Sequence, residues 1–327
     1  MKFLDKNYDS DYLWFQLAQT KGIGTQILWE IQKYCQDQQL NLCDLLSQSS
    51  DHPDRPLPIR LRTALNRPIP DLDTLHTTYQ TLQHHRVTLL TPDHPHFPPT
   101  LTPHNTRIPP LLYSRGHTPL ALAPSLAIVG SRHVDPETLT LTHQLAQNLA
   151  RSGYNIVSGY AKGVDTAAHL GALQAEGTTT LVLSLGILNF EARKEFKPWF
   201  TATNTLVFSQ FAPNSGWFAR QAMARNELVC RLAQAVIVIA SGPERDDRGR
   251  MSGTFAAAQT AFQLGLPVFV VSPQILSQLP AGNADLLELG GIELFLDRAP
   301  QQIQTHLNPL AIPESVPTLQ QLELIPS

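Results

Sequence analysis

Two glycine-rich turns, each carrying a cation, are the segments of this sequence best suited to bind an anion. The first reads Gly130-Ser131-Arg132, and the second runs from Gly159 through Lys162 and Gly163. Small residues let a phosphate approach the backbone, and the arginine and the lysine each add a full positive charge. Where such a turn opens a helix, the unpaired N–H groups of the first helical turn also face the anion. Together the two turns predict a phosphate-binding crevice.

A third group of polar residues lies further along the chain and is expected to join the same site. Arg225 and Asn226 fall within a predicted helix, and Ser252 and Gly253 open the next one. Serine is a preferred helix N-cap, so this helix start also supplies free backbone amides. For the glycines of these segments, a purely conformational role in reversing the chain stays open as an alternative.

Six short apolar runs alternate with helix-length segments from residue 125 onward, which is the pattern of parallel βαβ units. Nearly all of these runs are apolar on both faces, as burial between two layers of helices requires. We therefore expect an α/β fold with an extended Rossmann-like, doubly wound and mostly parallel sheet. Ligands of such sheets bind at the carboxyl ends of the strands, where both glycine-rich turns begin. The predicted strands are 125–131, 155–159, 179–186, 206–211, 235–242 and 267–273, and the predicted helices are 136–151, 163–176, 218–233 and 253–264.

The chain before this sheet has a different character. Apolar residues at helical spacing over residues 11–46 surround the tripeptide Gly22-Ile23-Gly24, which predicts two short helices joined by a tight turn, a helix-hairpin-helix pattern. Such a turn can present N–H groups to a DNA phosphate, but the glycines are equally explained by the turn itself. Twelve of the 26 prolines fall between Pro53 and Pro110, which predicts a linker and extended chain without long helices.

Composition and charge exclude several classes of protein. The 327 residues are 42% hydrophobic and 16% charged, which suits one large core and a smaller domain. Net charge is −3, and residues 130–250 form the only net-positive stretch, so an anion site must be a local cluster. No stretch approaches the roughly 18 apolar residues of a membrane span, so we expect a cytoplasmic protein without a membrane partner. The three cysteines, which show no metal-ligand spacing and suit a reducing compartment, are Cys35, Cys43 and Cys230.

Four strings resemble, in order and spacing, the core of the DNA-processing protein A (DprA/Smf) family. They are LAIVGSR (126–132), IVSGYAKGVDTAAHLGAL (156–173), RNELVCRLAQAVIVIASG (225–242) and MSGTFAAAQTAFQLGLPVFVVSP (251–273). The pattern SGxAxGVDxxAH within the second string is the most specific of these signals. The N-terminal hairpin resembles the SAM-like domain of the family, and the resemblance covers about residues 11–297.

The resemblance implies a DNA-binding protein and not an enzyme. It would bind single-stranded DNA and load a RecA-type recombinase, in natural transformation or related recombination, as a homodimer and without a catalytic residue, metal or cofactor. Asp165 would have a structural role, because a carboxylate that faces a phosphate would repel it. The residues that match the DNA- and phosphate-binding motifs of the family are Gly130, Ser131, Arg132, Gly159, Lys162, Gly163, Arg225, Asn226, Ser252 and Gly253.

The resemblance also divides the chain and shows where it departs from the family. Residues 1–80 would form a helical SAM-like domain and a proline-rich linker, and residues 81–300 the extended Rossmann-like DNA-binding domain. Residues 301–327 would be a tail too short for the winged helix of many members. Glu227 stands where a second basic residue usually follows the Arg-Asn pair, and residues 186–199 replace a Tyr-Pro segment. Both changes are expected to weaken the DNA-binding surface.

Two functions of other kinds use a similar sheet. Enzymes of the lysine-decarboxylase-like (LOG) group process nucleotides, but no PGGxGT motif follows any predicted strand here. A nucleotide-sensing module that binds a small ligand in the same crevice stays open as an alternative. A dinucleotide cofactor is disfavoured, because the first turn lacks the GxGxxG fingerprint.

Overall fold

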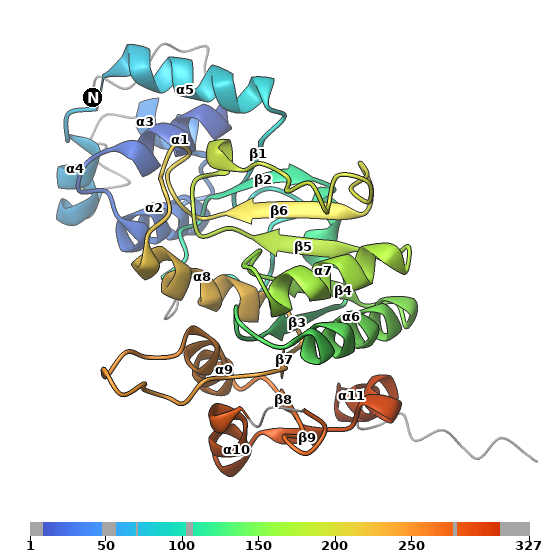
Figure 1. The fold of residues 1–327 in the computed structure, drawn as a ribbon. Coiled ribbons are helices and arrows are strands. Elements are labelled where there is room, and N and C mark those ends of the chain that lie inside the picture. The colour runs from blue at the N-terminus through green and yellow to red at the C-terminus, as the bar shows by residue number, and fades with distance from the viewer. Residues whose placement is uncertain (1–8, 48–56, 70, 103–106, 277–279, 308–327) are drawn as a thin grey trace, which may run out of the picture.

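The computed structural model describes residues 9–47, 57–69, 71–102, 107–276 and 280–307. Within these residues, one nine-stranded sheet has the order β1-β2-β6-β5-β4-β3-β7-β8-β9 and carries helices on both faces (Figure 1). The strands are β1 (Thr88–Leu90), β2 (Leu112–Gly116), β3 (Ser125–Val129), β4 (Asn155–Ser158), β5 (Thr179–Val182), β6 (Thr205–Ser209), β7 (Ala235–Val238), β8 (Val268–Val271) and β9 (Ile292–Leu294).

The sheet is mostly parallel, as predicted. All ladders from β6 across to β9 are parallel, whereas β2 joins β6, and β1 joins β2, through antiparallel ladders. All six predicted strands are present, which confirms the α/β, Rossmann-like fold class. From β3 the chain winds outward through β4, β5 and β6, and then crosses back to place β7 on the other side of β3. The switch point between β3 and β7 is therefore where a ligand crevice is expected.

Two cores fill the space between this sheet and its helices. The helices are α6 (Pro136–Arg151), α7 (Val164–Gln174), α8 (Ala219–Arg231), α9 (Gly253–Gln263), α10 (Ala281–Glu288) and α11 (Ala299–Leu307), with short 3-10 turns η1 (Thr118–Leu122), η2 (Ile187–Asn189) and η3 (Leu296–Arg298). Successive side chains of a strand point to opposite faces. Along β3, Leu126 and Ile128 therefore join the core under α6, α7 and α11, while Ala127 and Val129 join the core under α8 and α9.

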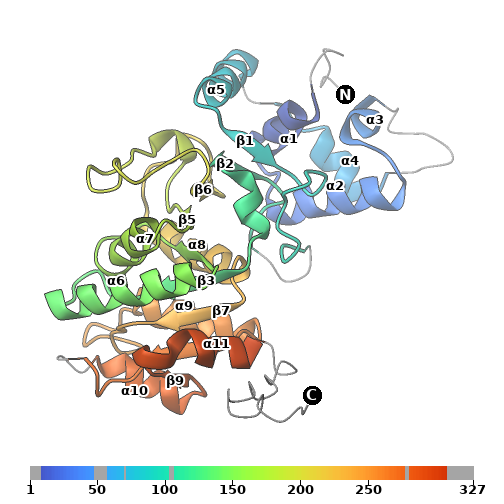
Figure 2. The same cartoon turned by 90° about the vertical axis from the view of Figure 1, so that its right-hand side faces the viewer.

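Five helices precede β1 in the described residues. They are α1 (Ser10–Gln19), α2 (Thr25–Asp37), α3 (Leu42–Ser47), α4 (Ile59–Leu65) and α5 (Leu72–His84). They gather at the β1 and β2 end of the sheet (Figure 2), and their core is continuous with Tyr113 of β2 and Val207 of β6. The predicted tight turn joins α1 to α2, and the φ of +84° at Gly22 favours glycine there.

The expectation that no long helix lies between Pro53 and Pro110 is wrong. α4 and the thirteen-residue α5 both lie in this region. The prolines cluster at its two ends and leave residues 71–91 free of them, which is enough for a helix of this length. Asp71 caps α5 by accepting a hydrogen bond from the Asp73 amide at 3.1 Å.

Two predicted boundaries fall inside helices. Residue 80 lies within α5, and residue 301 lies within α11, where Ile303 is buried in the core shared with α6. Packed structure thus continues past residue 301, while residues 308–327 of the expected tail lie outside the described residues. The division into domains stays a prediction. In the described part of the chain, no helix is both long and apolar enough to cross a membrane.

Candidate functional site

A pocket of about 510 Å³ lies at the switch point of the sheet. Its wall is formed by the end of β3, the turn into α7, one side of α8 and the start of α9. Gly159, Lys162 and Gly163 do not line it, although they belong to the turn that borders it. The predicted site residues that do line it are Gly130, Ser131, Arg132, Arg225, Asn226, Ser252 and Gly253, together with Asp165.

Arg225 of α8 brings a buried positive charge to the pocket. It is only 6% exposed, and its Nε has no hydrogen-bond partner among the described residues. Its guanidinium occupies the space beside Gly159, where an added Cβ would overlap it. Close approach of Arg225 is thus a reason for glycine at position 159. A buried N–H donor without an acceptor costs free energy, so this guanidinium is held in the pocket wall at an energetic cost.

Asp165 of α7 balances part of this charge. Burial raises the pKa of Asp165, and the positive charge of Arg225, followed by the Ala161 amide, opposes that rise. The Ala161 amide donates to Asp165 Oδ2 at 3.1 Å, so the carboxylate is bonded to the turn itself. Burial likewise lowers the pKa of Arg225; Asp165 opposes this shift and the nearby Arg132 adds to it. Two cations and one carboxylate therefore share this part of the site.

The turn after β3 is fixed by backbone contacts. Both the amide and the hydroxyl of Ser131 donate to the carbonyl oxygen of Ala240, at 2.8 and 3.0 Å. The Val164 amide at the start of α7 donates to Ser131 O at 3.3 Å. A Cβ on Gly163 would lie 2.5 Å from the carbonyl oxygen of Arg132, and the φ of +75° also favours glycine there. The two glycine-rich turns are thus packed directly against each other.

The start of α9 forms another wall of the pocket. Ser252 caps the helix by accepting a hydrogen bond from the Phe255 amide at 3.3 Å. Asn226 Nδ2 donates to the carbonyl oxygen of Gly253 at 2.9 Å and so ties α8 to α9. The amides at this helix start border the pocket and favour an anion.

Exposed apolar side chains and an arginine surround the pocket mouth. Trp217 is 51% exposed, and the Arg132 guanidinium lies 5.8 Å from the centroid of its ring. Met223 and Met251 line the pocket and are also exposed. Nothing in the sequence pattern singles out the two methionines, because they come from segments far apart in the chain.

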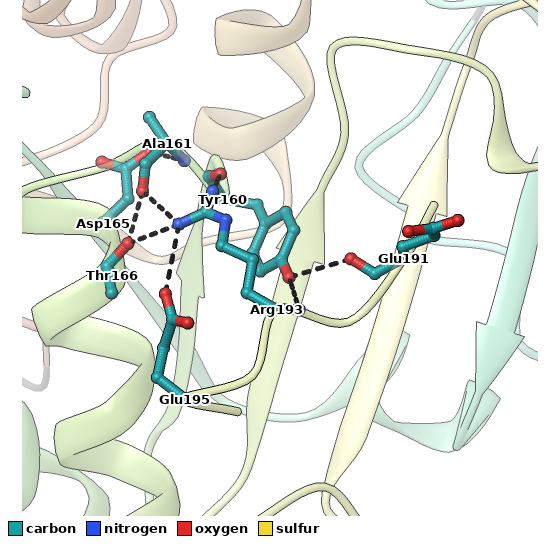
Figure 3. Close-up of polar contacts among 7 residues, drawn as sticks. All are labelled: Tyr160, Ala161, Asp165, Thr166, Glu191, Arg193 and Glu195. Carbon is teal, nitrogen blue, oxygen red and sulfur yellow. Dashed lines mark hydrogen bonds and ion pairs between the residues drawn. The ribbon is translucent and has the colours of Figure 1, made fainter. Parts of the chain in front are cut away.

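A second cluster lies on the other side of the turn between β4 and α7 (Figure 3). The Arg193 guanidinium donates to Tyr160 O, to Thr166 Oγ1 at 2.8 Å and to Ala161 O at 3.5 Å. It also lies 4.1 Å from the centroid of the Tyr160 ring. Arg193 does not line the pocket. No motif marks this residue, because residues 186–199 show neither helical nor strand periodicity.

Glu227, which stands where the family usually has a basic residue, bonds neighbouring groups of the protein, and its expected effect on DNA binding stays a prediction. Its Oε1 accepts a hydrogen bond from Arg231 Nε at 2.8 Å, and its Oε2 accepts one from the Arg107 amide at 3.4 Å. Glu227 does not line the pocket. Its negative charge is therefore directed to a different side of α8 from Arg225, because helical residues two positions apart point about 200° apart.

The sequence matches a known family over most of its length. The model of the family described as DNA recombination-mediator protein A matches residues 88–305. The DNA processing protein DprA of Streptococcus pneumoniae is 32% identical over 184 residues, which are 56% of this chain and 62% of that protein. Protein Smf of Synechocystis sp. is 31% identical over 187 residues, which are 55% of this chain and 44% of that protein. The matched part thus spans about half the length of these curated relatives.

Two solved structures share the fold. The X-ray structure of DprA from S. pneumoniae covers 90% of this chain and 97% of its own, with a TM-score of 0.65 and 23% identity. A structure from a study of the single-stranded DNA binding mode of DNA processing protein A from Helicobacter pylori covers 68% of this chain and 98% of its own, with a TM-score of 0.54 and 28% identity.

The binding roles of the individual pocket residues stay predictions, whereas the family of the chain is established by the match. Its model spans β1 to α11 and so includes the whole switch-point pocket. With the strand order, the paired glycine-rich turns and the matched sequence in agreement, the chain belongs to the DNA recombination-mediator protein A (DprA/Smf) family.

Proposed function

We propose that this protein binds single-stranded DNA at the switch-point pocket and loads a RecA-type recombinase onto it. The observation that carries this proposal is the excess of positive charge in the pocket wall, where the buried Arg225 and the nearby Arg132 face a single carboxylate, Asp165. A DNA phosphate supplies both the negative charge and the acceptor oxygens that such cations bind.

Other features of the pocket favour a single strand over a duplex. Arg132 and the start of α9 offer further contacts to phosphate, and the exposed Trp217 offers a face on which an unpaired base can stack. The bases of a duplex are already stacked on each other and do not present their faces. The H. pylori relative, which is studied for its single-stranded DNA binding mode, supports the same ligand.

The roles beyond DNA binding rest on the family. Recombinase loading in natural transformation or related recombination, action as a homodimer, a cytoplasmic location and a binding role without catalysis are all part of the proposal. A dimer that binds one strand at two pockets would gain affinity, because the second contact becomes intramolecular. The Asp165 carboxylate accepts a hydrogen bond from the turn backbone, which favours a structural role for this residue over a catalytic one.

The DNA-binding part is tested by fluorescence anisotropy with a labelled single strand and its duplex at two salt concentrations. We expect preferential binding of the single strand, weakened in Arg132→Ala and in Lys162→Ala. Each lost phosphate contact should reduce the slope of log affinity against log salt by about 0.7. Arg151→Ala is the matched control, because this exposed arginine ends α6 and does not line the pocket.

Absence of single-strand binding at low salt would overturn this proposal. A small nucleotide would then be the better ligand for the pocket. Thermal unfolding would detect it, because a ligand at a hundred times its dissociation constant adds about 2.7 kcal/mol to stability.

Recombinase loading is tested separately with single-stranded DNA already coated by a single-strand-binding protein. We expect this protein to accelerate the DNA-dependent ATP hydrolysis of a RecA-type recombinase on the coated strand. Arg132→Ala should reduce the acceleration in proportion to its loss of DNA affinity. An unchanged rate with wild-type protein that binds DNA would leave DNA binding standing and refute loading.

A further inference from the structure

The turn between β4 and α7 contains a tyrosine in a backbone conformation that suits glycine. Tyr160 has a φ of +59°, in the left-handed region where the Cβ of an L-residue approaches its own carbonyl group. The Tyr160 side chain does not reach the pocket. Contacts made by the rest of the protein must therefore hold the turn in this shape.

Arg193 makes those contacts from the segment that follows η2. Its guanidinium donates to the carbonyl oxygens of Tyr160 and Ala161 and to Thr166 Oγ1, whose own hydroxyl donates to Ala161 O at 2.7 Å. The Arg193 amide donates to Tyr160 Oη at 2.9 Å, and Tyr160 Oη donates to Glu191 O at 3.2 Å. Figure 3 shows the tyrosine hydroxyl bonded to Glu191 and the Arg193 guanidinium bonded to Ala161 and Thr166.

The opposite side of the same turn belongs to the pocket. The Ala161 carbonyl oxygen faces Arg193 and Thr166, while the Ala161 amide donates to Asp165, which lies beside Arg225. One peptide segment thus links the two clusters. Lys162, an exposed predicted DNA contact, is the next residue along the chain.

Arg193 itself is poorly placed to touch a ligand in the pocket. Its side chain is 27% exposed, and its NH1 and NH2 groups already donate to two carbonyl oxygens and a hydroxyl. It comes from residues 186–199, the segment that departs from the family pattern. This segment therefore supplies a support for the turn, while its expected effect on DNA binding stays a prediction.

We propose that Arg193 is a positioning residue that holds the turn over residues 159–163 in its binding shape, and so places Lys162 against the backbone of single-stranded DNA. This inference rests on the proposed function. A positioning role makes the contributions of Arg193 and Lys162 to affinity depend on each other, whereas two independent phosphate contacts would be additive.

The test is a double-mutant cycle on single-stranded DNA affinity with Arg193→Ala, Lys162→Ala and the double variant. We expect each single substitution to weaken binding by about tenfold, the scale of one charge-assisted contact. The double variant should lose no more affinity than the single variant with the larger loss. Lys194→Ala removes the same charge one residue away and should bind like wild type. An additive double variant overturns the positioning role.

Arg193→Lys separates geometry from charge. The ammonium keeps the positive charge but cannot bond the carbonyls and the hydroxyl in the planar arrangement of a guanidinium. We expect this variant to bind as weakly as Arg193→Ala. Wild-type affinity in Arg193→Lys would show that only the charge matters and would overturn the inference.

Amide hydrogen exchange on the DNA-free protein provides a readout that does not depend on the proposed function. Arg193→Ala should accelerate exchange at residues 159–164 while leaving the rest of the sheet unchanged. Unchanged exchange in this turn overturns the inference even if the protein binds DNA. Accelerated exchange in a protein that does not bind DNA would instead refute the proposed function, and with it the role of Lys162.

Discussion

Two arginines reach the turn between β4 and α7 from opposite sides, and they differ in what their donors meet. Arg193 bonds two carbonyl oxygens of the turn and the hydroxyl of Thr166 in α7, so its charge is used within the protein. Arg225 is almost fully buried beside Gly159 and keeps an Nε without a partner among the described residues. The comparison teaches that two arginines at one turn can differ in whether the protein itself satisfies their donors, and only Arg225 also lines the pocket.

Replacing Arg225 is expected to have the largest effect and tests directly whether the two arginines differ in role. In Arg225→Ala we expect stability to fall by roughly 3–5 kcal/mol, because Asp165 stays buried without its cation. Single-stranded DNA affinity should fall as well. The measurements are denaturant unfolding and fluorescence anisotropy.

The double variant Arg225→Ala with Asp165→Asn separates the two effects. Removing the unpaired carboxylate should recover stability without recovering DNA affinity. If affinity returns together with stability, Arg225 is a structural residue like Arg193, and the difference between the two arginines disappears.

Trp217→Ala tests whether the pocket side also binds bases. We expect single-stranded DNA affinity to fall by about 1–3 kcal/mol, the range found for stacking of one base on an aromatic ring. The unfolding midpoint should hardly change, because the side chain is 51% exposed. Trp199→Ala is the matched control, since Trp199 is 39% exposed and does not line the pocket. Equal losses in the two variants would show that Trp217 has no special role.

His169 provides a pH test on the Arg193 side of the turn. Burial, with Arg193 and then Arg225 adding to it, lowers the pKa of His169 from 6.5 to about 3. Its Nδ1 donates to Thr179 Oγ1 at 2.7 Å, because that hydroxyl itself donates to Ile156 O. Between these two pKa values the unfolded chain binds a proton that the folded protein does not.

Stability should therefore fall as pH drops through this window, by up to about 1.4 kcal/mol per pH unit from His169 alone. His169→Asn removes this component. As the pH falls from 6.5 to 3, the variant should therefore lose less stability than wild type. Urea unfolding at several pH values measures the difference. Parallel curves for the two proteins would mean that His169 titrates normally.

The smallest effect is expected for Glu227→Gln, which tests how far the proposed DNA-binding surface extends along α8. Because the carboxylate bonds Arg231 and does not line the pocket, we expect DNA affinity to change by less than about twofold and stability to fall by about 0.5 kcal/mol. Anisotropy and urea unfolding measure the two quantities. A clear gain in affinity would place Glu227 on the DNA path after all.

The regular elements of the sheet were largely predictable. The predicted helix 136–151 has the same bounds as α6, and the apolar run at 235–242 contains β7. These segments carry local signals, such as Asp135 as N-cap followed by Pro136, or a run of residues apolar on both faces. The antiparallel strands β1 and β2 were missed, because runs of only three and five residues are too short to show a period of their own.

What the sequence determined by itself was local: the alternation of strand and helix, the glycine-rich turns after the first two predicted strands, and the cations beside them. Tertiary structure alone decided that Arg193 bonds a turn 33 residues earlier in the chain, and that Arg225 lies against Gly159 with a donor unused. Periodicity and capping depend on neighbours a few residues apart, and these the sequence shows directly. Whether an arginine meets a carbonyl oxygen or an open pocket depends on segments that only the folded sheet brings together.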